Sequence, residues 1–129
     1  MNPARNWREI PQRYRLEAAK CSKCGKVHFP PRVVCDECRT TTFETVILPE
    51  TGTVETYTVI RVAPAGFTDE CPYALGVVKL ANGVRIMAQI VDLNPDELKI
   101  GLPVKIEFRK IQSDGERGIH GYGYKVVPV

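Results

Sequence analysis

Apolar and polar residues alternate along much of the second half of the chain. The alternation spans residues 84–90, 104–109 and 122–126, and a period of two residues is typical of β-strands with one face against a core. Residues 53–62 are rich in β-branched side chains, which strands favour, and residues 73–80 complete the set. The sequence therefore predicts five strands between residues 53 and 126.

The residues between these strands predict how the strands connect. Asn82-Gly83 is a strong hairpin signal, and residues 63–72 form a loop with two prolines and a glycine. Asn94 can cap a single helical turn that begins at Pro95, and a polar loop covers residues 112–118. Five strands with a helical turn between the third and the fourth predict a small Greek-key barrel of the OB type.

The start of the chain predicts a helix followed by a strand. Pro3 suits a first helical turn, and Trp7 and Ile10 would share one face of a helix over residues 2–10. Pro11 would end that helix, because the residue before a proline is pushed out of helical geometry. The alternation of residues 13–18 then predicts a strand that leads into the first cysteine pair.

Four cysteines form two pairs with the same internal spacing, Cys21 with Cys24 and Cys35 with Cys38. Each C-x2-C pair is a short knuckle that can direct two sulfurs at one point, and two knuckles close a tetrahedral thiolate cage. Gly25 follows the first pair, where a tight knuckle needs a residue that tolerates a positive φ. The doubled spacing therefore predicts a metal site.

The predicted metal is structural zinc, with iron in a rubredoxin-like cage as the alternative. Nothing else in the chain indicates electron transfer, and four protein ligands leave no open position for water. Basic side chains beside the knuckles could offset the formal charge of −2 that four thiolates leave on Zn²⁺. These basic residues are Lys20, Lys23, Lys26, Arg32 and Arg39.

The predicted elements divide the chain into three segments. Residues 1–19 contain the N-terminal helix and lead-in strand, and residues 20–48 contain the zinc ribbon with a strand over residues 43–48. Residues 49–129 contain the OB-fold. The predicted fold class is therefore mainly β, with a short N-terminal helical segment.

Composition places the chain among globular proteins of one or two small domains. Its 129 residues are 43% hydrophobic and 26% charged, with a formal net charge of +3, which permits anionic ligands without requiring nucleic acid. No apolar run approaches the roughly 20 residues that span a bilayer, and the polar N-terminus lacks the apolar core of a signal peptide. We expect a cytoplasmic protein whose paired cysteines bind metal and form no disulfides.

No residue pattern outside the cage predicts catalysis. Cys71 lies in a loop, and neither His28 nor His120 is tied to it by sequence as an activating base. We interpret Cys71 as a loop or packing residue, His28 as a surface or packing histidine, and His120 as part of a flexible turn. With no activated nucleophile, carboxylate pair or open metal position, the sequence predicts a protein that is not an enzyme.

Two segments near the cage could contact an anion or a flat ring. One is Phe29-Pro30-Pro31-Arg32, which two prolines stiffen and whose guanidinium can contact a phosphate; packing of Phe29 on the barrel is the alternative. The other is the basic N-terminus, for which a charged, solvated face is the alternative. Its relevant residues are Arg5, Trp7, Arg8, Arg13, Tyr14 and Arg15.

The cysteine motifs and the strands after them together resemble the DUF35 family. The resemblance covers almost the whole chain and implies a helical segment, a rubredoxin-like zinc ribbon and an OB-fold, in that order. Asp36 follows Cys35 where the family commonly has a proline, a departure that leaves the ligands untouched. The matching segments are residues 21–25, 29–32, 35–38, 52–54, 56–59, 66–67, 72–73, 83–101 and 104.

The resemblance also implies a role in acyl-CoA and lipid metabolism. DUF35 proteins accompany thiolase-like condensing enzymes, including the acetyl-CoA acetyltransferase and HMG-CoA synthase pair of the mevalonate pathway, as non-catalytic partners that help to bind CoA. We therefore expect an accessory or scaffold protein that binds CoA or acyl-CoA beside such an enzyme and does not associate with a membrane. A cleft between ribbon and barrel could supply the contacts, and the candidate ligand-binding residues are Arg8, Phe29, Arg32 and Phe67.

A single-stranded nucleic-acid-binding protein is the alternative, because zinc ribbons and OB barrels both serve that role. Nucleic-acid-binding OB-folds stack bases on aromatic side chains of the sheet. The second and third predicted strands, residues 75–80 and 84–90, contain no aromatic residue, and basic residues are interspersed with acidic ones. The sequence therefore favours the CoA-associated role.

Overall fold

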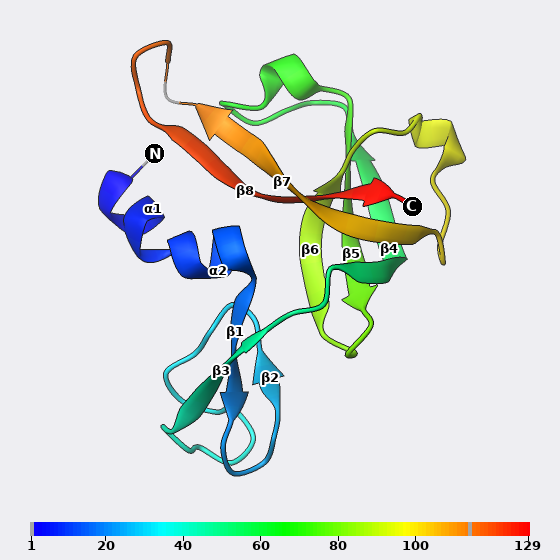
Figure 1. Cartoon of the computed structure of the whole chain (residues 1–129). Helices are drawn as coiled ribbons and strands as arrows, with labels where there is room; N and C mark the ends of the chain where they lie inside the picture. Colours follow the sequence, from blue (N-terminus) through cyan, green and yellow to red (C-terminus); the bar gives the residue numbers. More distant parts are fainter. Residues whose placement is uncertain (1, 114) are drawn as a thin grey trace.

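The computed structural model of the chain describes residues 2–113 and 115–129. It contains two short helices, a three-stranded ribbon and a closed barrel. Figure 1 shows the ribbon below the barrel, with the two helices beside the junction. We call the junction between the ribbon and the barrel the seam, and elements from the start, middle and end of the chain surround it.

The N-terminal segment is helical for longer than the sequence predicts. α1 (Pro3–Arg8) is followed at once by α2 (Ile10–Arg15), so the strand predicted over residues 13–18 is wrong in its first half. Pro11 lies in the first turn of α2, where its missing N–H breaks no helical hydrogen bond and its fixed φ suits the helix. Leu16 ends α2 in the left-handed conformation, with φ 54°.

The ribbon is a three-stranded antiparallel sheet. β1 (Glu17–Cys21) lies in the middle, between β2 (Val27–His28) and β3 (Phe43–Ile47). β3 confirms the strand predicted over residues 43–48, whereas no sequence signal predicted β2, which is two residues long. A sheet this small buries little apolar surface, so the metal cage has to supply much of its stability.

The barrel has five strands, as predicted. They close in the order β4-β5-β6-β8-β7, with β6 and β8 parallel and all other pairs antiparallel. This Greek-key connectivity confirms the OB type. The strands are β4 (Thr51–Ile60), β5 (Tyr73–Leu80), β6 (Arg85–Ile90), β7 (Pro103–Ser113) and β8 (His120–Pro128).

The connections follow most of the turn signals. Gly83, with φ 89°, turns β5 into β6, and Asn94 Oδ1 accepts the Asp96 N–H at 3.1 Å to cap the 3-10 turn η2 (Pro95–Glu97). A second 3-10 turn, η1 (Thr68–Glu70), lies within the loop predicted over residues 63–72. β7 continues to Ser113, into the loop predicted over residues 112–118.

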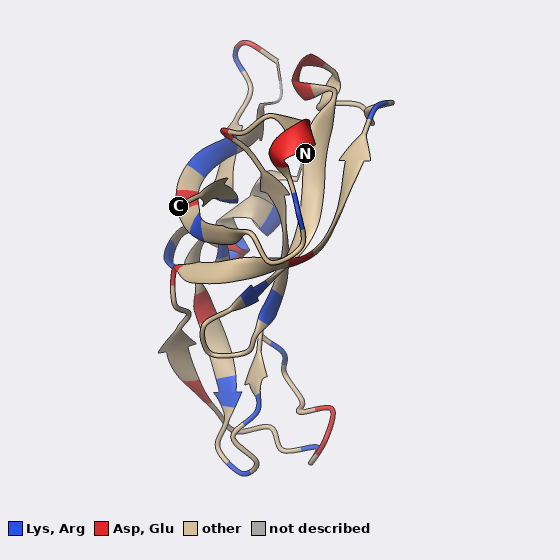
Figure 2. Ribbon diagram, turned by 90° about the vertical axis from the view of Figure 1, so that its right-hand side faces the viewer, with Lys and Arg blue, Asp and Glu red and all other residues tan. Residues whose placement is uncertain are grey.

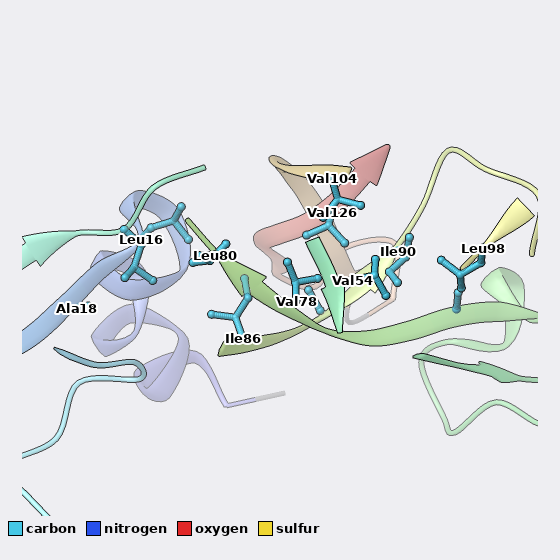
Figure 3. Close-up of a cluster of buried hydrophobic side chains, with 13 residues drawn as sticks. Leu16, Ala18, Val54, Val78, Leu80, Ile86, Ile90, Leu98, Val104 and Val126 are labelled. Atoms are coloured by element: carbon cyan, nitrogen blue, oxygen red, sulfur yellow. The ribbon is translucent and has the colours of Figure 1, made fainter. Parts of the chain in front are cut away.

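One apolar core extends from the ends of the ribbon into the barrel, as Figure 3 shows. Leu16 precedes β1 and Leu48 follows β3, and both side chains belong to the barrel core. The Leu48 N–H donates to the Leu16 carbonyl at 3.0 Å, so the two ends of the ribbon meet at the barrel. Four valines at the centre of the core are almost completely buried: Val54, Val78, Val104 and Val126.

Candidate metal centre and seam cleft

The two cysteine knuckles have the same backbone geometry. In each, the residue four positions after the first cysteine donates its N–H to that cysteine's carbonyl, from Gly25 to Cys21 and from Arg39 to Cys35, both at 3.0 Å. Gly25 and Arg39 have φ values of 77° and 59°. The positive φ predicted for Gly25 is confirmed, and Arg39 adopts the same conformation without the freedom of a glycine.

The knuckles bring four sulfur atoms to one point. The Sγ atoms of Cys21, Cys24, Cys35 and Cys38 all lie within 4.8 Å of one another, with 3.3 Å between Cys21 and Cys38 and 3.6 Å between Cys24 and Cys35. A tetrahedron of Zn–S bonds of about 2.3 Å places its sulfurs about 3.8 Å apart, so the cluster fits the metal. Four thiolates complete the coordination of Zn²⁺, which makes the zinc structural.

The groups around the sulfurs favour thiolate at some positions and oppose it at others. Hydrogen bonds from the side chain and backbone of Thr40, whose Oγ1 lies 3.2 Å from Cys38 Sγ, lower the pKa of Cys38 to about 6. At Cys24 the Lys26 N–H lowers the pKa, but desolvation and the neighbouring sulfurs outweigh it and raise the pKa to about 12. A bound Zn²⁺ resolves this conflict, because its charge stabilises all four thiolates together.

Lys26 is one of the basic residues expected to offset the charge of the cage, but it has other partners. Its Nζ lies 2.8 Å from Asp36 Oδ1 and 3.6 Å from Glu37 Oε1. The hydrogen bond from Lys26 also holds the pKa of Asp36 below its usual range. The ion pair therefore ties the first knuckle to the second, a mechanical role that sequence spacing did not reveal.

The remaining cysteine and one histidine have packing roles. His28 is 4% exposed, and its ring meets Phe43 edge-on with 5.8 Å between centroids. The Cys71 thiol donates to the Arg61 carbonyl at 2.7 Å. His120 is exposed at the start of β8, so the turn expected there is replaced by the first residue of a strand.

A cleft of about 470 Å³ opens where the ribbon meets the barrel, and we call it the seam cleft. Phe29, from the segment after β2, and Phe67, from the loop before η1, both line it. Phe29 packs against Tyr124 of β8 at 5.7 Å between centroids, and Phe67 against Tyr73 of β5 at 6.0 Å. The cleft therefore has aromatic walls supplied by both halves of the molecule.

Most charged and amide side chains of the seam cleft belong to the N-terminal helical segment, and β6 and β7 contribute Gln89 and Gln112. Arg5 and Arg13 both pair with Glu9, Arg5 through Nε at 3.1 Å, so two guanidinium groups share one carboxylate and leave a net positive charge. Gln89 is buried and donates from Nε2 to Glu70 Oε2 at 2.8 Å. Its Oε1 is also buried and has no hydrogen-bond partner among the described residues.

The structure brings together only some of the predicted ligand-binding residues. Phe29 and Phe67 share the seam cleft, whereas Arg32 lines a second cleft of about 480 Å³ between the ribbon and the β5–β6 hairpin, with Phe29 common to both. Arg8 is exposed on α1 and lines neither cleft. The arginines that do line the seam cleft belong to the same basic N-terminal segment.

Among the residues of the seam cleft that sequence reasoning did not single out are Tyr73, Gln89 and Tyr124. Each lies within a predicted strand, so its position was expected. Alternation predicts which residues share a face of a strand, but it does not predict which face of the barrel contacts the ribbon.

Neither α-helix in the described part of the chain can cross a membrane, because each has six residues and neither is long and apolar enough. Figure 2 shows that basic and acidic residues occur in both the ribbon and the barrel, without separation into two regions.

Comparison with known proteins matches both parts of the chain. Residues 8–44 match a family profile described as the rubredoxin-like zinc ribbon domain of ChsH2, and residues 45–109 match its C-terminal OB-fold domain. These matches agree with the observed fold and confirm zinc as the metal of the cage.

Individual proteins resemble the chain over different lengths. A DUF35 domain-containing scaffold protein of Methanocaldococcus jannaschii is 44% identical over 126 residues, 97% of this chain and 89% of that protein. The benzoylsuccinyl-CoA thiolase subunit BbsA of Thauera aromatica is 32% identical over 75 residues, 58% of this chain and 51% of that protein. A solved structure described as the Ltp2-ChsH2(DUF35) aldolase has a TM-score of 0.76 at 28% identity and covers 99% of this chain and 96% of that one.

Proposed function

This chain belongs to the DUF35 family of zinc-ribbon and OB-fold proteins, and from that premise we propose that it is a non-catalytic scaffold subunit that binds acyl-CoA beside a thiolase-like condensing enzyme. The names of similar proteins support this role. One relative is a scaffold protein, another is a thiolase subunit, and the similar solved structure is an aldolase complex. The partner that we propose is an acetyl-CoA acetyltransferase, an HMG-CoA synthase or both, as in the mevalonate pathway.

The seam cleft is the observation on which the acyl-CoA part of this proposal rests. Its volume of about 470 Å³ is in the range of small-molecule sites, and its walls combine apolar surface with a few polar groups, as such sites do. It lies between two domains, where ligand sites are frequent. The second cleft has comparable volume, but Phe29 is the one Phe, Tyr or Trp among the described residues that line it.

The chemistry of the cleft matches the three parts of CoA. Phe29, Phe67 and neighbouring tyrosines offer faces on which adenine can stack. The pair Arg5 and Arg13, with one shared carboxylate between them, offers guanidinium groups for phosphate. The side-chain amides of Gln12 and Gln112, which line the cleft, offer hydrogen-bonding groups for the pantetheine arm. Arg32 and Arg8 stay predictions for phosphate contacts outside this cleft.

The non-catalytic part of the proposal rests on the closed cage and on the surroundings of Cys71. Four cysteine ligands leave the zinc without a position for a reacting water. The Cys71 thiol donates to a backbone carbonyl and has no histidine partner among the described residues. We therefore assign the chemistry of the complex to the partner enzyme.

Affinity purification of the tagged chain from its native host tests the partner, with zinc measured in the eluate. We expect a thiolase-type subunit to co-purify together with about one zinc per chain, which is the stoichiometry of a four-cysteine site. An eluate without any condensing enzyme would refute the scaffold role.

Calorimetry with coenzyme A and acetyl-CoA tests the ligand, first with the chain alone and then with the purified complex. We expect binding in at least the complex, and we expect Phe67→Ala to weaken it by roughly fivefold, since loss of one aromatic contact costs on the order of 1 kcal/mol. Ile100→Ala, at an exposed position outside both clefts, is the matched control. If neither the chain alone nor the complex bound these compounds, the proposal that CoA or acyl-CoA is the ligand would be wrong.

The charges of the barrel give no specific support to single-stranded nucleic-acid binding as the function. Arg85 pairs with Glu55 at 2.6 Å and Arg109 with Asp92 at 2.6 Å, which leaves these guanidinium groups less available to phosphates. Tight, salt-sensitive retention of single strands in a filter-binding assay would nevertheless revive that function.

A further inference from the structure

Large apolar side chains gather on one outer face of the molecule, away from the core. Trp7 is 76% exposed and Phe108 is 53% exposed, although burial of a large apolar side chain is worth roughly 1.5–3 kcal/mol. We call this surface the aromatic face and define it by five exposed residues: Trp7, Tyr14, Phe108, Ile119 and Tyr122.

The aromatic face is an ordered surface built by four elements, α1, α2, β7 and β8. Tyr14 of α2 meets Phe108 of β7 edge-on at 4.9 Å between centroids, and Phe108 stacks on Tyr122 of β8 at 5.3 Å. Trp7 of α1 joins Tyr14 and Tyr122 around a hollow of about 190 Å³. Figure 1 shows α1 and α2 alongside the start of β8, and the first residues of β8 line the hollow together with the two helices.

The aromatic face continues a buried face of β8 out to the surface. Val126, Tyr124 and Tyr122 alternate along β8 and therefore share one face of the strand. Val126 is fully buried in the barrel, Tyr124 packs against Phe29, and Tyr122 is exposed. A surface with the composition of a core and no cover among the described residues is typical of a protein-binding site.

The charge beside the aromatic face indicates the kind of partner. Residues 2–16 contain four arginines and one acidic residue, Glu9. Arg8 follows Trp7, is exposed, and has no ion pair among the residues that the structure describes. Interfaces with a tryptophan and tyrosine centre and an arginine rim are strongly bound when the partner offers an apolar patch bordered by carboxylates.

We propose that the aromatic face is the docking surface for the condensing-enzyme subunit, through an apolar patch bordered by Asp and Glu side chains. This inference rests on the proposed function, because it takes its occupant from there. Arg13 lines both the hollow of the aromatic face and the seam cleft. An enzyme docked on this face therefore adjoins the seam cleft, where its active site can receive the acyl group of a ligand bound there.

The test uses the full-length chain and the thiolase-type subunit that co-purifies with it, each purified separately, with the dissociation constant measured by calorimetry. We expect Trp7→Ala and Tyr122→Ala each to raise the dissociation constant at least tenfold, as central aromatic contacts do. Arg8→Glu should raise it roughly fivefold at low salt and less at high salt, because the rim acts through screened charge. Val62→Ala, at a 90% exposed position outside the aromatic face, should change it less than about twofold.

The outcomes separate this inference from the proposed function. If the wild-type chain binds the enzyme and the Trp7 and Tyr122 variants bind equally well, the aromatic face is not the docking surface, while the scaffold role stands. If the wild-type chain does not bind the enzyme at all, both are wrong. Sedimentation of the chain alone provides the last check, because a dimer that Trp7→Ala dissociates would make a second copy the occupant and overturn the proposal.

Discussion

The ribbon and the barrel are both small antiparallel β-structures, but different forces stabilise them. The ribbon has strands of five, two and five residues, and its two fully buried cysteines belong to the metal cage. The barrel has strands of up to eleven residues around an apolar core of valine, leucine, isoleucine and alanine. Metal coordination organises one domain and hydrophobic burial the other, so the two should respond to different perturbations.

Removal of a zinc ligand should produce the largest difference between the responses of the two domains. We expect Cys38→Ser to release the zinc and unfold the ribbon, since binding of structural zinc contributes on the order of 10 kcal/mol to such modules. The barrel should stay folded, although partner binding should weaken. Elemental analysis and amide hydrogen exchange, read separately for β1–β3 and β5–β6, measure both effects.

Cys71→Ser is the matched control for this variant, because its sulfur lies outside the cage. It should leave the zinc content and the exchange of the ribbon unchanged. Retention of full zinc by the Cys38 variant, or loss of protection in β5 and β6, would break the distinction between a metal-stabilised ribbon and a self-sufficient barrel.

Leu48→Ala should have the next largest effect, and it should destabilise the barrel while the ribbon keeps its zinc. Leu48 follows the last strand of the ribbon, but its side chain is 2% exposed within the barrel core. We expect a loss of about 2–5 kcal/mol in the free energy of unfolding of the barrel, with the zinc retained. Urea denaturation followed through barrel signals, together with metal analysis, measures this; a variant that lost zinc without barrel destabilisation would place Leu48 in the ribbon.

Gly76→Ala should destabilise the barrel alone and by a smaller amount. An added Cβ at Gly76 would lie 2.8 Å from the Thr56 carbonyl oxygen and 2.7 Å from Ile90 Cδ1, so neighbouring strands must shift at a cost of about 1–3 kcal/mol. Gly25→Ala is its counterpart in the ribbon, where nothing lies within 4 Å and only the positive φ of 77° opposes the change. Thermal unfolding of both variants would show whether steric crowding by the added Cβ lowers the stability of the barrel variant alone.

The smallest effect should come from a surface ion pair of the barrel. Hydrogen bonds from Arg109 hold the pKa of Asp92 below its usual range, so the pair contributes stability above the unfolded pKa of about 3.9. That contribution disappears as the pH falls through the lowered pKa of the folded state. Arg109→Gln should therefore reduce stability slightly at neutral pH and not at low pH, which urea titrations at pH 7 and pH 2 would detect. An equal loss at both pH values would assign the effect to packing.

The sequence predicted the barrel well because its signals are local. Alternation located β6 and the first half of β7, and Asn82-Gly83 located the hairpin between β5 and β6. Spacing alone identified the metal ligands, because a C-x2-C knuckle is a local backbone structure whose geometry hardly depends on the rest of the fold. The positive φ of Gly25 could be predicted for the same reason, because the turn of the knuckle depends on neighbouring residues alone.

The seam was harder to predict because it depends on how distant segments meet. Pro11 is compatible both with the end of one helix and with the first turn of another, and only the packing of α2 against β8 decides between them. The rotation of α1 then determines that Arg5 lines the seam cleft and Arg8 does not. Tyr124 could be recognised as a strand residue, but not as the one that Phe29 would cover.

The hydrogen bond between Leu48 and Leu16 makes the ribbon an interchangeable insertion. The ribbon lies between the N-terminal helices and the barrel, and its two ends are tied together at the barrel. Docking of the helices on the barrel therefore closes a loop of roughly 30 residues, at a cost of about 3 kcal/mol in loop-closure entropy. A different closed module, or a short turn, could occupy the same position without changing the order of the barrel strands. The junction thus allows one half of the seam cleft to be exchanged in evolution or by design while the other half stays fixed.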